Sequence, residues 1–282
     1  MTNPTMLGSV DFSSTPSTSN PFHPEDLAIS PTGRYVVVSD GYSYCTYRVN
    51  LGVASIDVTS RNLVQYLTLA SPKQAQNVSV DNYGNVFVGD YCNRRLYLLR
   101  IDSNGALTDT GATFDFSYAP FNSYVSPDSS RLFVVGEGGI TVFQINGAGS
   151  ITKILESTTV GKIQSMAFSP DGTKVFLGDY STSPDRIIVA NTNNLTVITT
   201  VDILTDQTAG YFDVDVMSVE PNGQKLYMGN MADGTTRTNK VTVVNLDDYV
   251  LSTIDLASDS VPTALAFRGV YRFDLRLPLV LR

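Results

Sequence analysis

One phrase recurs along the chain, and this repetition constrains the fold more than any other feature of the sequence. Each copy has an apolar–small–apolar triplet, a polar turn that contains proline or glycine, and then an apolar run. A sixth copy begins at residues 265–267, and successive copies are 43–51 residues apart, with equivalent positions at Ser30, Asp81, Ser126, Ser169 and Glu220. A period of this length indicates one supersecondary unit per repeat, packed on its neighbours.

Each repeat contains four short runs of β-branched and aromatic residues, separated by turns rich in Asn, Asp and Gly. Such runs are typical of strands joined by hairpins, and no stretch of useful length has helical periodicity. The second run of each repeat ends in an acid or its amide, at Asp40, Asp90, Glu137, Asp179 and Asn230. Four-stranded antiparallel units that repeat every ~40–50 residues predict a β-propeller.

Ring closure predicts six blades. Five periods cover most of the chain, and the residues left at the two ends together make one more period. The sixth blade is expected to combine C-terminal strands at 263–267 and 273–281 with an N-terminal strand near 6–12, which removes the free sheet edges of an open ring. We therefore expect one all-β domain over residues 1–282, a six-bladed β-propeller of four-stranded antiparallel blades closed by its N- and C-terminal strands.

Composition excludes several classes of function. The net charge of −8 is a poor match for nucleic-acid phosphates, and no window approaches the ~20 apolar residues of a membrane span. The single histidine, His23, excludes sites with several histidines. Residues 1–20 do not have the pattern of a signal peptide, so we expect an intracellular protein or one whose leader was removed. Low lysine content and many Thr, Asn and Ser residues favour an extracellular or cell-surface location.

The repeats resemble the YVTN-type β-propeller repeats of surface-layer and lactonase-like proteins. The resemblance rests on the Ser-Pro-Asp-Gly turn, the apolar run that ends in an acid or Asn, and the next apolar run with its Asx turn; residues 169–179 match best. The absence of Gly-His and Trp excludes WD40 repeats and disfavours kelch repeats. The resemblance implies the fold, which hosts both hydrolases and adhesion modules.

The recurring acids at the ends of the second runs have two interpretations. Their side chains can accept hydrogen bonds from the backbone of the turn, or they can form a ring of carboxylates for cations. Because a structural repeat places the same residue type in every copy, we favour the structural interpretation.

A second polar set varies between repeats and lies just before the first strand, at the predicted mouth of the central channel. Converging oxygen side chains can coordinate Ca²⁺, which takes about 6–8 oxygen ligands. The six-bladed calcium-dependent phosphotriesterases and gluconolactonase-like hydrolases hold a metal in this way. The similarity implies a calcium site at Glu25, Asn122, Gln164 and Asp215, with Gln164 standing where that family has Asn. The alternative is that these residues line a water-filled channel.

His23 is the candidate catalytic residue, as a general base, because it lies two positions before Glu25 and the ordinary pKa of imidazole is near 6.5. The alternative is a loop histidine without a role. Cys45 and Cys92 follow the second strands of adjacent repeats, and a disulfide needs Cα atoms within about 7 Å. Because neighbouring blades splay outward, we expect two free thiols; flexible loops would allow the bond.

Two functions follow from these features. The first is a non-enzymatic binding or surface-recognition propeller of the YVTN type, a monomer that takes a protein or small-molecule ligand at the channel mouth. The second is a calcium-dependent hydrolase of lactones or phosphoesters, with Ca²⁺ in the channel as Lewis acid. An ion with several oxygen ligands at the mouth would favour the second.

Overall fold

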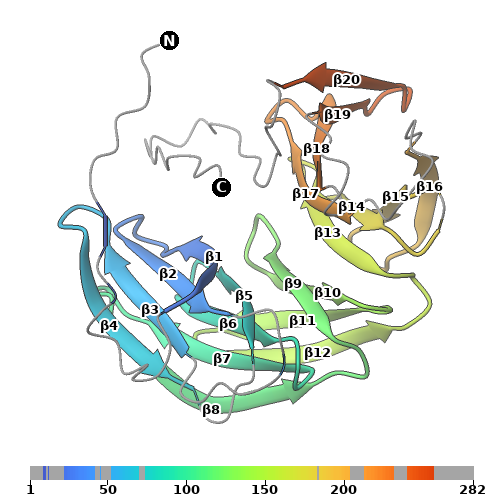
Figure 1. Ribbon diagram of the computed structural model, residues 1–282. Helices are drawn as coiled ribbons and strands as arrows, with labels where there is room; N and C mark the ends of the chain where they lie inside the picture. The colour runs from blue at the N-terminus through green and yellow to red at the C-terminus, as the bar shows by residue number, and fades with distance from the viewer. Residues whose placement is uncertain are drawn as a thin grey trace. The chain divides into compact units, whose positions relative to one another are not determined.

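A computed structural model describes residues 9–10, 12, 22–41, 45, 52–69, 74–182, 184–203, 213–231 and 240–256, with the backbone alone at 213–215 and 230–231. The described residues form twenty strands in five antiparallel sheets of four strands each (Figure 1). Within every sheet the strands are neighbours in chain order. The prediction of an all-β chain with four strands per repeat is therefore confirmed. Nothing in the described ranges forms a helix that could cross a membrane.

The chain divides into two compact units, and unit 1, Met1–Thr158, contains three sheets. Sheet 1 consists of β1 (Pro24–Ile29), β2 (Tyr35–Asp40), β3 (Gly52–Asp57) and β4 (Asn62–Thr68). Sheet 2 consists of β5 (Ala75–Val80), β6 (Asn85–Asp90), β7 (Arg95–Ile101) and β8 (Leu107–Asp115). Sheet 3 consists of β9 (Pro120–Val125), β10 (Arg131–Gly136), β11 (Gly139–Gly147) and β12 (Ser150–Ser157).

Unit 2, Thr159–Arg282, contains the other two sheets that the structure describes. Sheet 4 consists of β13 (Ile163–Phe168), β14 (Lys174–Asp179), β15 (Arg186–Asn191) and β16 (Val197–Asp202). Sheet 5 consists of β17 (Asp213–Val219), β18 (Lys225–Met231), β19 (Lys240–Asn245) and β20 (Leu251–Asp255).

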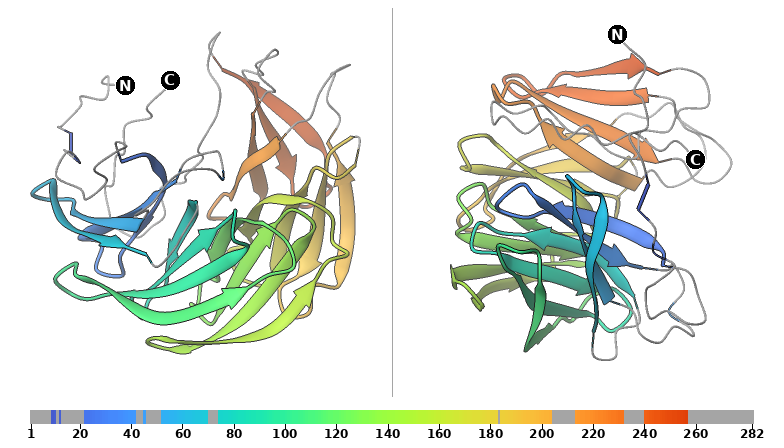
Figure 2. Two further views of the ribbon diagram at one scale, coloured as in Figure 1. Left: turned by 60° about the horizontal axis from the view of Figure 1, so that its bottom comes forward. Right: turned by 90° about the vertical axis from the view of Figure 1, so that its left-hand side faces the viewer.

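Adjacent sheets within a unit lie face to face (Figures 1 and 2). Their side chains form shared core clusters. All six residues of β2 are buried, and Tyr35 and Val37 belong to a core cluster with sheet 2, whereas Val36 and Val38 belong to a cluster on the opposite face. In unit 2, Phe176 of sheet 4 packs in one cluster with Leu226 and Met228 of sheet 5. A second strand that is apolar on both faces requires cover on both sides.

The recurring phrase forms the turn between the first and second strands. In sheet 4 the Ser169 hydroxyl donates to Asp171 at 2.6 Å, and Gly172 has a φ of 68°. Sheet 3 has Ser129 at the position of that glycine, with a φ of 54°, a conformation that costs a non-glycine residue about 1–3 kcal/mol. The Ser129 hydroxyl accepts a hydrogen bond from the backbone N–H of Asn82 in sheet 2 at 3.1 Å, which offsets part of this cost.

The predicted sixth blade falls mostly outside the described residues. The C-terminal strands expected at 263–267 and 273–281 lie there entirely, and of the N-terminal strand expected near 6–12 only residues 9, 10 and 12 are described, outside any strand. Val10 and Phe12 pack against the cluster that contains Val36 and Val38, and the rings of Phe12 and Phe22 stack with centroids 4.1 Å apart. The blade count and the closure of the ring stay predictions.

Cys45 and Cys92 form a disulfide with Cα atoms 5.5 Å apart, so the expectation of two free thiols is wrong. Cys92 follows directly on the second strand of sheet 2, and Cys45 follows the second strand of sheet 1. The second strands end close to the inner strands, where adjacent sheets pack together. The outward splay on which the expectation rested applies to the outer strands.

Removal of this disulfide is expected to destabilise the protein. Loop-closure entropy for cysteines 47 residues apart corresponds to about 4 kcal/mol at most, and measured effects of native disulfides are typically about 2–4 kcal/mol. We expect Cys45→Ser/Cys92→Ser to lower the free energy of unfolding in urea by about 2–4 kcal/mol. Reduced wild-type protein is the control and should match the double variant. A loss below about 0.5 kcal/mol in both samples would contradict a native bond.

Candidate functional site

Each of the five sheets that the structure describes has a β-bulge near the start of its first strand, at the same place in its register with the second strand. The pairing shifts between Pro24 and Leu27 in sheet 1, and at equivalent places in the other four sheets. The inserted residues are Glu25 with Asp26 in sheet 1, then Gln76, Phe121, Gln164 and Asp215 in sheets 2 to 5. A bulge re-aims a side chain and is common at barrel rims and beside functional sites. Each repeat can therefore present a different side chain at this position.

Three of the four predicted calcium ligands, Glu25, Gln164 and Asp215, occupy the bulge position. Asn122 lies one residue further along, because Phe121 is the inserted residue of sheet 3; the Phe121 ring stacks on Tyr91 with centroids 5.4 Å apart. Glu25 and Asn122 belong to unit 1, and Gln164 and Asp215 belong to unit 2. The side chain of Asp215 is outside the described set, and a site that all four share stays a prediction.

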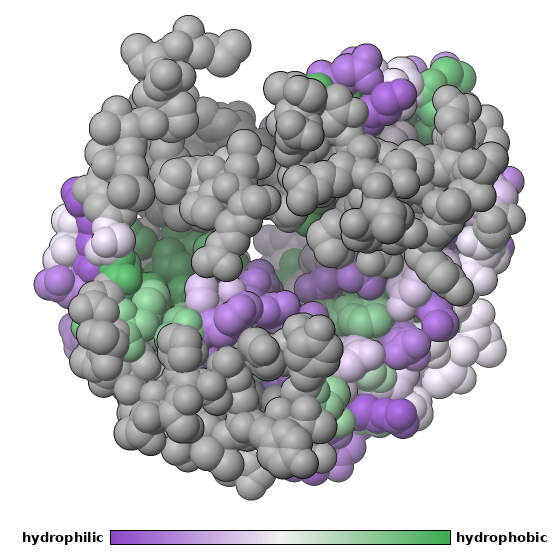
Figure 3. All heavy atoms as spheres, in the orientation of Figure 1, coloured by the Kyte–Doolittle hydropathy of each residue, from purple (hydrophilic) through white to green (hydrophobic). Residues whose placement is uncertain are grey.

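Asp26, the second residue at the bulge of sheet 1, and Asn77, the residue after the bulge of sheet 2, tie neighbouring first strands of unit 1 together. Asp26 of β1 accepts a hydrogen bond from the backbone N–H of Val78 in β5 at 3.0 Å, and Asn77 of β5 donates to the carbonyl oxygen of Phe121 in β9 at 2.9 Å. Hydrophilic residues gather over these inner strands in the space-filling view (Figure 3). These polar side chains therefore act first as links between sheets.

Asp26 and Asn77 belong to the variable polar set that precedes the first strands, but the predicted calcium ligands did not include them. Their signal in the sequence is a polar residue two positions before the small residue in the middle of the first strand, Ala28 in β1 and Ser79 in β5. Asn77 is 1% exposed, and its Oδ1 has no hydrogen-bond partner among the described residues. A buried acceptor without a protein partner is a place for an ordered water or a cation.

His23 and Glu25 are an accessible titratable pair at this end of unit 1. Nδ1 of His23 lies 3.8 Å from Oε2 of Glu25, and the histidine side chain is 45% exposed. Partial burial raises the pKa of Glu25, and the nearby His23 lowers it by a smaller amount. A carboxyl group with a raised pKa beside an imidazole is suited to proton exchange, but the catalytic role of His23 stays a prediction.

Asp26 is a half-buried acid of this region with a raised pKa. Desolvation raises its pKa to about 6, against the backbone hydrogen bonds from Val78 and Leu27, which favour the charged form. The negative charge of Glu25 raises the pKa further. The hydroxyl of Ser39 accepts a hydrogen bond from the backbone N–H of Asp26 at 3.1 Å and holds the bulge in place. Asp26 therefore titrates closer to neutral pH than an ordinary aspartate.

The acids that end the second strands are clamps on the backbone. Asp40, Asp90 and Asp179 are at most 1% exposed. Each accepts a hydrogen bond of 2.9–3.2 Å from the backbone N–H that leads into the first strand of its own sheet, namely His23, Gln74 and Lys162. The second carboxylate oxygen binds the side chain of Tyr66, Asn93 or Arg186 respectively. Asp90 and Asp179 also accept from the backbone N–H groups of Asn93 and Ser181 in the turn that follows, as the structural interpretation predicted, whereas a backbone bond to Asp40 comes from His23.

Unit 1 by itself offers only part of a calcium site. The carboxylate of Glu25 and the Oδ1 of Asn77 are oxygen donors of the kind that Ca²⁺ binds. Both carboxylate oxygens of Asp26 already accept backbone hydrogen bonds. Across the part of the chain that the structure describes, no three His, Cys, Asp or Glu side chains lie close enough to hold a metal ion. A complete coordination shell would need further oxygen ligands.

No protein-family model matches this sequence, and no curated protein matches it. Solved structures do match. A Lactobacillus plantarum protein has a TM-score of 0.66 at 23% identity, over 84% of this chain and 71% of that chain. A Bacteroides uniformis protein described as a candidate 6-phosphogluconolactonase has a TM-score of 0.61 at 16% identity, over 84% and 72%. The β-propeller domain of Cps50 (Swd1) from Myceliophteria thermophila has a TM-score of 0.57 at 10% identity, over 80% and 66%.

At these identities the likeness concerns the fold alone. The chain shares with these proteins an all-β architecture of the propeller kind, in agreement with its five four-stranded antiparallel sheets. The resemblance to propeller repeats is thus supported at the level of the fold.

The raised pKa of Asp26 makes stability depend on pH. Because the folded state holds this proton more tightly than the unfolded state does, its contribution is full below about pH 4 and is lost as the pH rises through about 6. We expect wild type to lose about 1–2 kcal/mol relative to Asp26→Asn between pH 4 and 7, after a discount for partial exposure. Urea unfolding at several pH values measures this difference.

Asp128→Asn is the matched control for this titration. Hydrogen bonds from Ser126 and Ser130 lower the pKa of Asp128, so its difference from wild type should appear as the pH falls below about 4, with the opposite sign. A stability difference between wild type and Asp26→Asn that stays constant from pH 4 to 7 would contradict the burial of Asp26.

Proposed function

We propose that this protein is a non-enzymatic binding or surface-recognition β-propeller of the YVTN type. Its ligand, a protein or a small molecule, binds where the first strands begin. The observation that carries this proposal is the use of three acids at this end of unit 1: Asp26, Asp40 and Asp90 commit their carboxylates to hydrogen bonds from the backbone. The accessible groups at this end of unit 1 are those of Glu25 and His23, which suit contact with a ligand.

The proposal includes a six-bladed ring over residues 1–282. The sixth blade would come from residues 257–282 and the N-terminal segment around Val10 and Phe12. In support, Leu27 and Ile29 of β1 are 46% and 39% exposed and pair in register with Val38 and Val36. Hydrophobic residues also reach the surface over sheet 1 (Figure 3). The apolar alternation that suits a covering strand is Tyr271, Phe273, Leu275, Leu277 and Leu279.

A pair of charge substitutions tests this closure. If a sixth blade covers β1, Leu27→Asp buries a carboxylate and should lower the free energy of unfolding by about 2–4 kcal/mol. Val64→Asp is the matched control, because Val64 is 41% exposed on the outer strand β4 and no blade is expected there. We expect it to cost less than about 0.5 kcal/mol. Equally small losses in urea unfolding would exclude cover on β1.

The Cys45–Cys92 disulfide supports a location outside the cytosol. Disulfides persist in oxidising compartments and are rare where glutathione keeps thiols reduced. This agrees with the extracellular or cell-surface location that the composition favours. We propose that the protein acts there as a monomer, without nucleic acid and without a membrane span.

A calcium-dependent hydrolase of lactones or phosphoesters is the alternative. It is favoured by the contact between His23 and Glu25 at 3.8 Å, by the raised pKa of Glu25 and by the buried Oδ1 of Asn77. In this alternative Glu25, Asn122, Gln164 and Asp215 would hold Ca²⁺, which would supply Lewis-acid polarisation of a carbonyl or phosphoryl oxygen, and His23 would be the general base.

Thermal unfolding and hydrolysis assays with Ca²⁺ or EDTA decide between the two functions. A hydrolase with calcium in the channel should gain about 2.7 kcal/mol of stability at a hundredfold excess over Kd, and Asp215→Asn should weaken this gain. The binding module should hydrolyse neither δ-gluconolactone nor a phosphotriester above background in either condition.

Hydrolysis that needs Ca²⁺ and is lost in Glu25→Gln would overturn our proposal, whereas a rise in melting temperature with Ca²⁺ but no hydrolysis would indicate a structural ion. Asp128→Asn, in an exposed turn, is the control for loss of one charge.

A further inference from the structure

Where two described sheets are adjacent within one unit, the first residue of a second strand faces the turn between the third and fourth strands of the next sheet. In unit 1 this crevice is filled twice. The Tyr35 ring lies so close to Gly105 that a Cβ there would come within 2.6 Å of it. Asn85 donates to the carbonyl oxygen of Gly147 at 2.9 Å and accepts from the backbone N–H of Gly149. Tyr35 and Asn85 are buried, and both belong to the contact between sheets.

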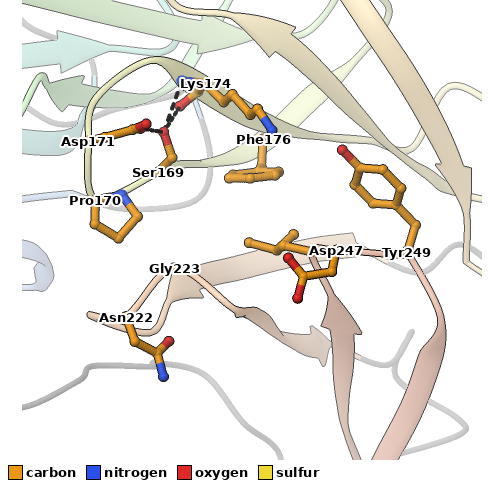
Figure 4. Close-up of a pocket in the computed structure, with 10 residues that line it drawn as sticks. Ser169, Pro170, Asp171, Lys174, Phe176, Asn222, Gly223, Asp247 and Tyr249 are labelled. Atoms are coloured by element: carbon orange, nitrogen blue, oxygen red, sulfur yellow. Dashed lines mark hydrogen bonds between the residues drawn. The ribbon is translucent and has the colours of Figure 1, made fainter.

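The equivalent crevice between sheets 4 and 5 is open. Lys174 begins β14 as Tyr35 begins β2, and the turn between β19 and β20 faces it across a cavity of about 280 Å³ (Figure 4). Lys174 and Phe176 lie on the same face of β14, two residues apart, and Lys174 extends over Phe176 toward Tyr249 (Figure 4). The fourth repeat thus has a cavity at the position that Tyr35 fills in the first repeat and Asn85 fills in the second.

Among the described residues, no hydrogen bond or ion pair is formed by the side chains of three polar residues that line this cavity, Lys174, Tyr249 and Asp247. The Lys174 ammonium acts on the Asp171 carboxylate only by a weaker electrostatic attraction. Asp171, in contrast, is occupied by Ser169, which donates at 2.6 Å, and by Thr173, and these bonds lower its pKa to about 2. The cavity therefore offers two neighbouring donors, one of them cationic, and one separate carboxylate acceptor.

The Tyr249 side chain is held by an unusual backbone. Tyr249 has a φ of 60°, and its backbone N–H donates to the carbonyl oxygen of Asn245 at 2.8 Å. Arg61 and Leu195 have the same conformation at the equivalent turns of sheets 1 and 4. The turn fixes the direction in which the side chain of residue 249 leaves the backbone, and the Tyr249 ring lies at the cavity beside Lys174 and Phe176 (Figure 4).

We propose that this cavity is a binding site for a hydroxylated carboxylate of monosaccharide size, such as a uronic acid. The carboxylate would bind Lys174 and Tyr249, hydroxyl groups would bind Asp247 and Asn222, and the carbon face would lie on the apolar floor of Phe176 and Leu246. A cavity just below the usual range of about 300–1,000 Å³ suits a ligand of this size. Two acids at the rim disfavour a dianion. This site is separate from the first-strand ends, so it stands or falls independently of the function proposed above.

Calorimetric or NMR titration with D-glucuronate and D-glucose tests the site. We expect wild type to bind D-glucuronate about tenfold more tightly than D-glucose, since only the acid pairs with the ammonium. Lys174→Met should remove this preference, and Tyr249→Phe, which keeps the ring, should reduce it. Lys153→Met is the control, because Lys153 carries the same charge in unit 1, where it pairs with Glu156. It should leave both affinities unchanged.

Four outcomes would overturn the proposal. Two concern wild type: equal affinity for the two sugars, and no binding of D-glucuronate at about 50 mM. Two concern the variants: an unchanged preference for D-glucuronate in Lys174→Met, and a loss of this preference in Lys153→Met as large as in Lys174→Met. Thermal unfolding of each variant confirms that it is folded, and Tyr249→Phe provides a second measure if Lys174→Met is unstable.

Discussion

A sheet whose second strand is apolar on both faces has to be covered on both sides, and the rest of this structure depends on that requirement. Val36 and Val38 on one face of β2, and Tyr35 and Val37 on the other, belong to different core clusters. Each repeat is therefore incomplete alone and stable only between neighbours. The same requirement makes the partly exposed Leu27 and Ile29 informative, since they extend a face whose other residues are buried.

Packing the first strands side by side determines which polar groups are available for function. Their backbones approach closely in unit 1, and Asp26 and Asn77 are used to join one strand to the next. The bulge beside them inserts a residue that is free to vary, as Glu25, Gln76 and Phe121 illustrate. A residue that links two strands is therefore the direct neighbour of a residue that varies between repeats. An error of one position in the strand register would assign the function to the wrong residue.

Contact between adjacent sheets also determines what is available at the first residue of the second strand, where this residue faces a turn of the next sheet. Tyr35 and Asn85 fill their crevices and add to the contact between sheets. Lys174 leaves its crevice open, although it begins the equivalent strand. The long, flexible side chain of Lys174 does not fill the space between the sheets, and its ammonium group keeps a hydrated positive charge there. A negatively charged ligand would occupy this space and pair with the charge.

The sequence by itself determined the repeat, the four strands of each copy and the propeller class. These depend on the local alternation of side chains and on turn chemistry, as in the Ser169–Asp171 turn. It also indicated the clamping role of Asp40, Asp90 and Asp179, because a structural residue recurs with its structure.

Only the tertiary structure decided the contacts that join one repeat to another. The Cys45–Cys92 bond depends on where two connections meet, and the pKa of Asp26 depends on burial against β5. The structure also decided that Phe121 is the inserted residue of sheet 3, one position before the predicted calcium ligand Asn122, because the register of two strands depends on their pairing. The open crevice at Lys174 was likewise invisible in the sequence. Cavities, burial and long-range bonds are set by distances between segments, and these distances are absent from a linear pattern.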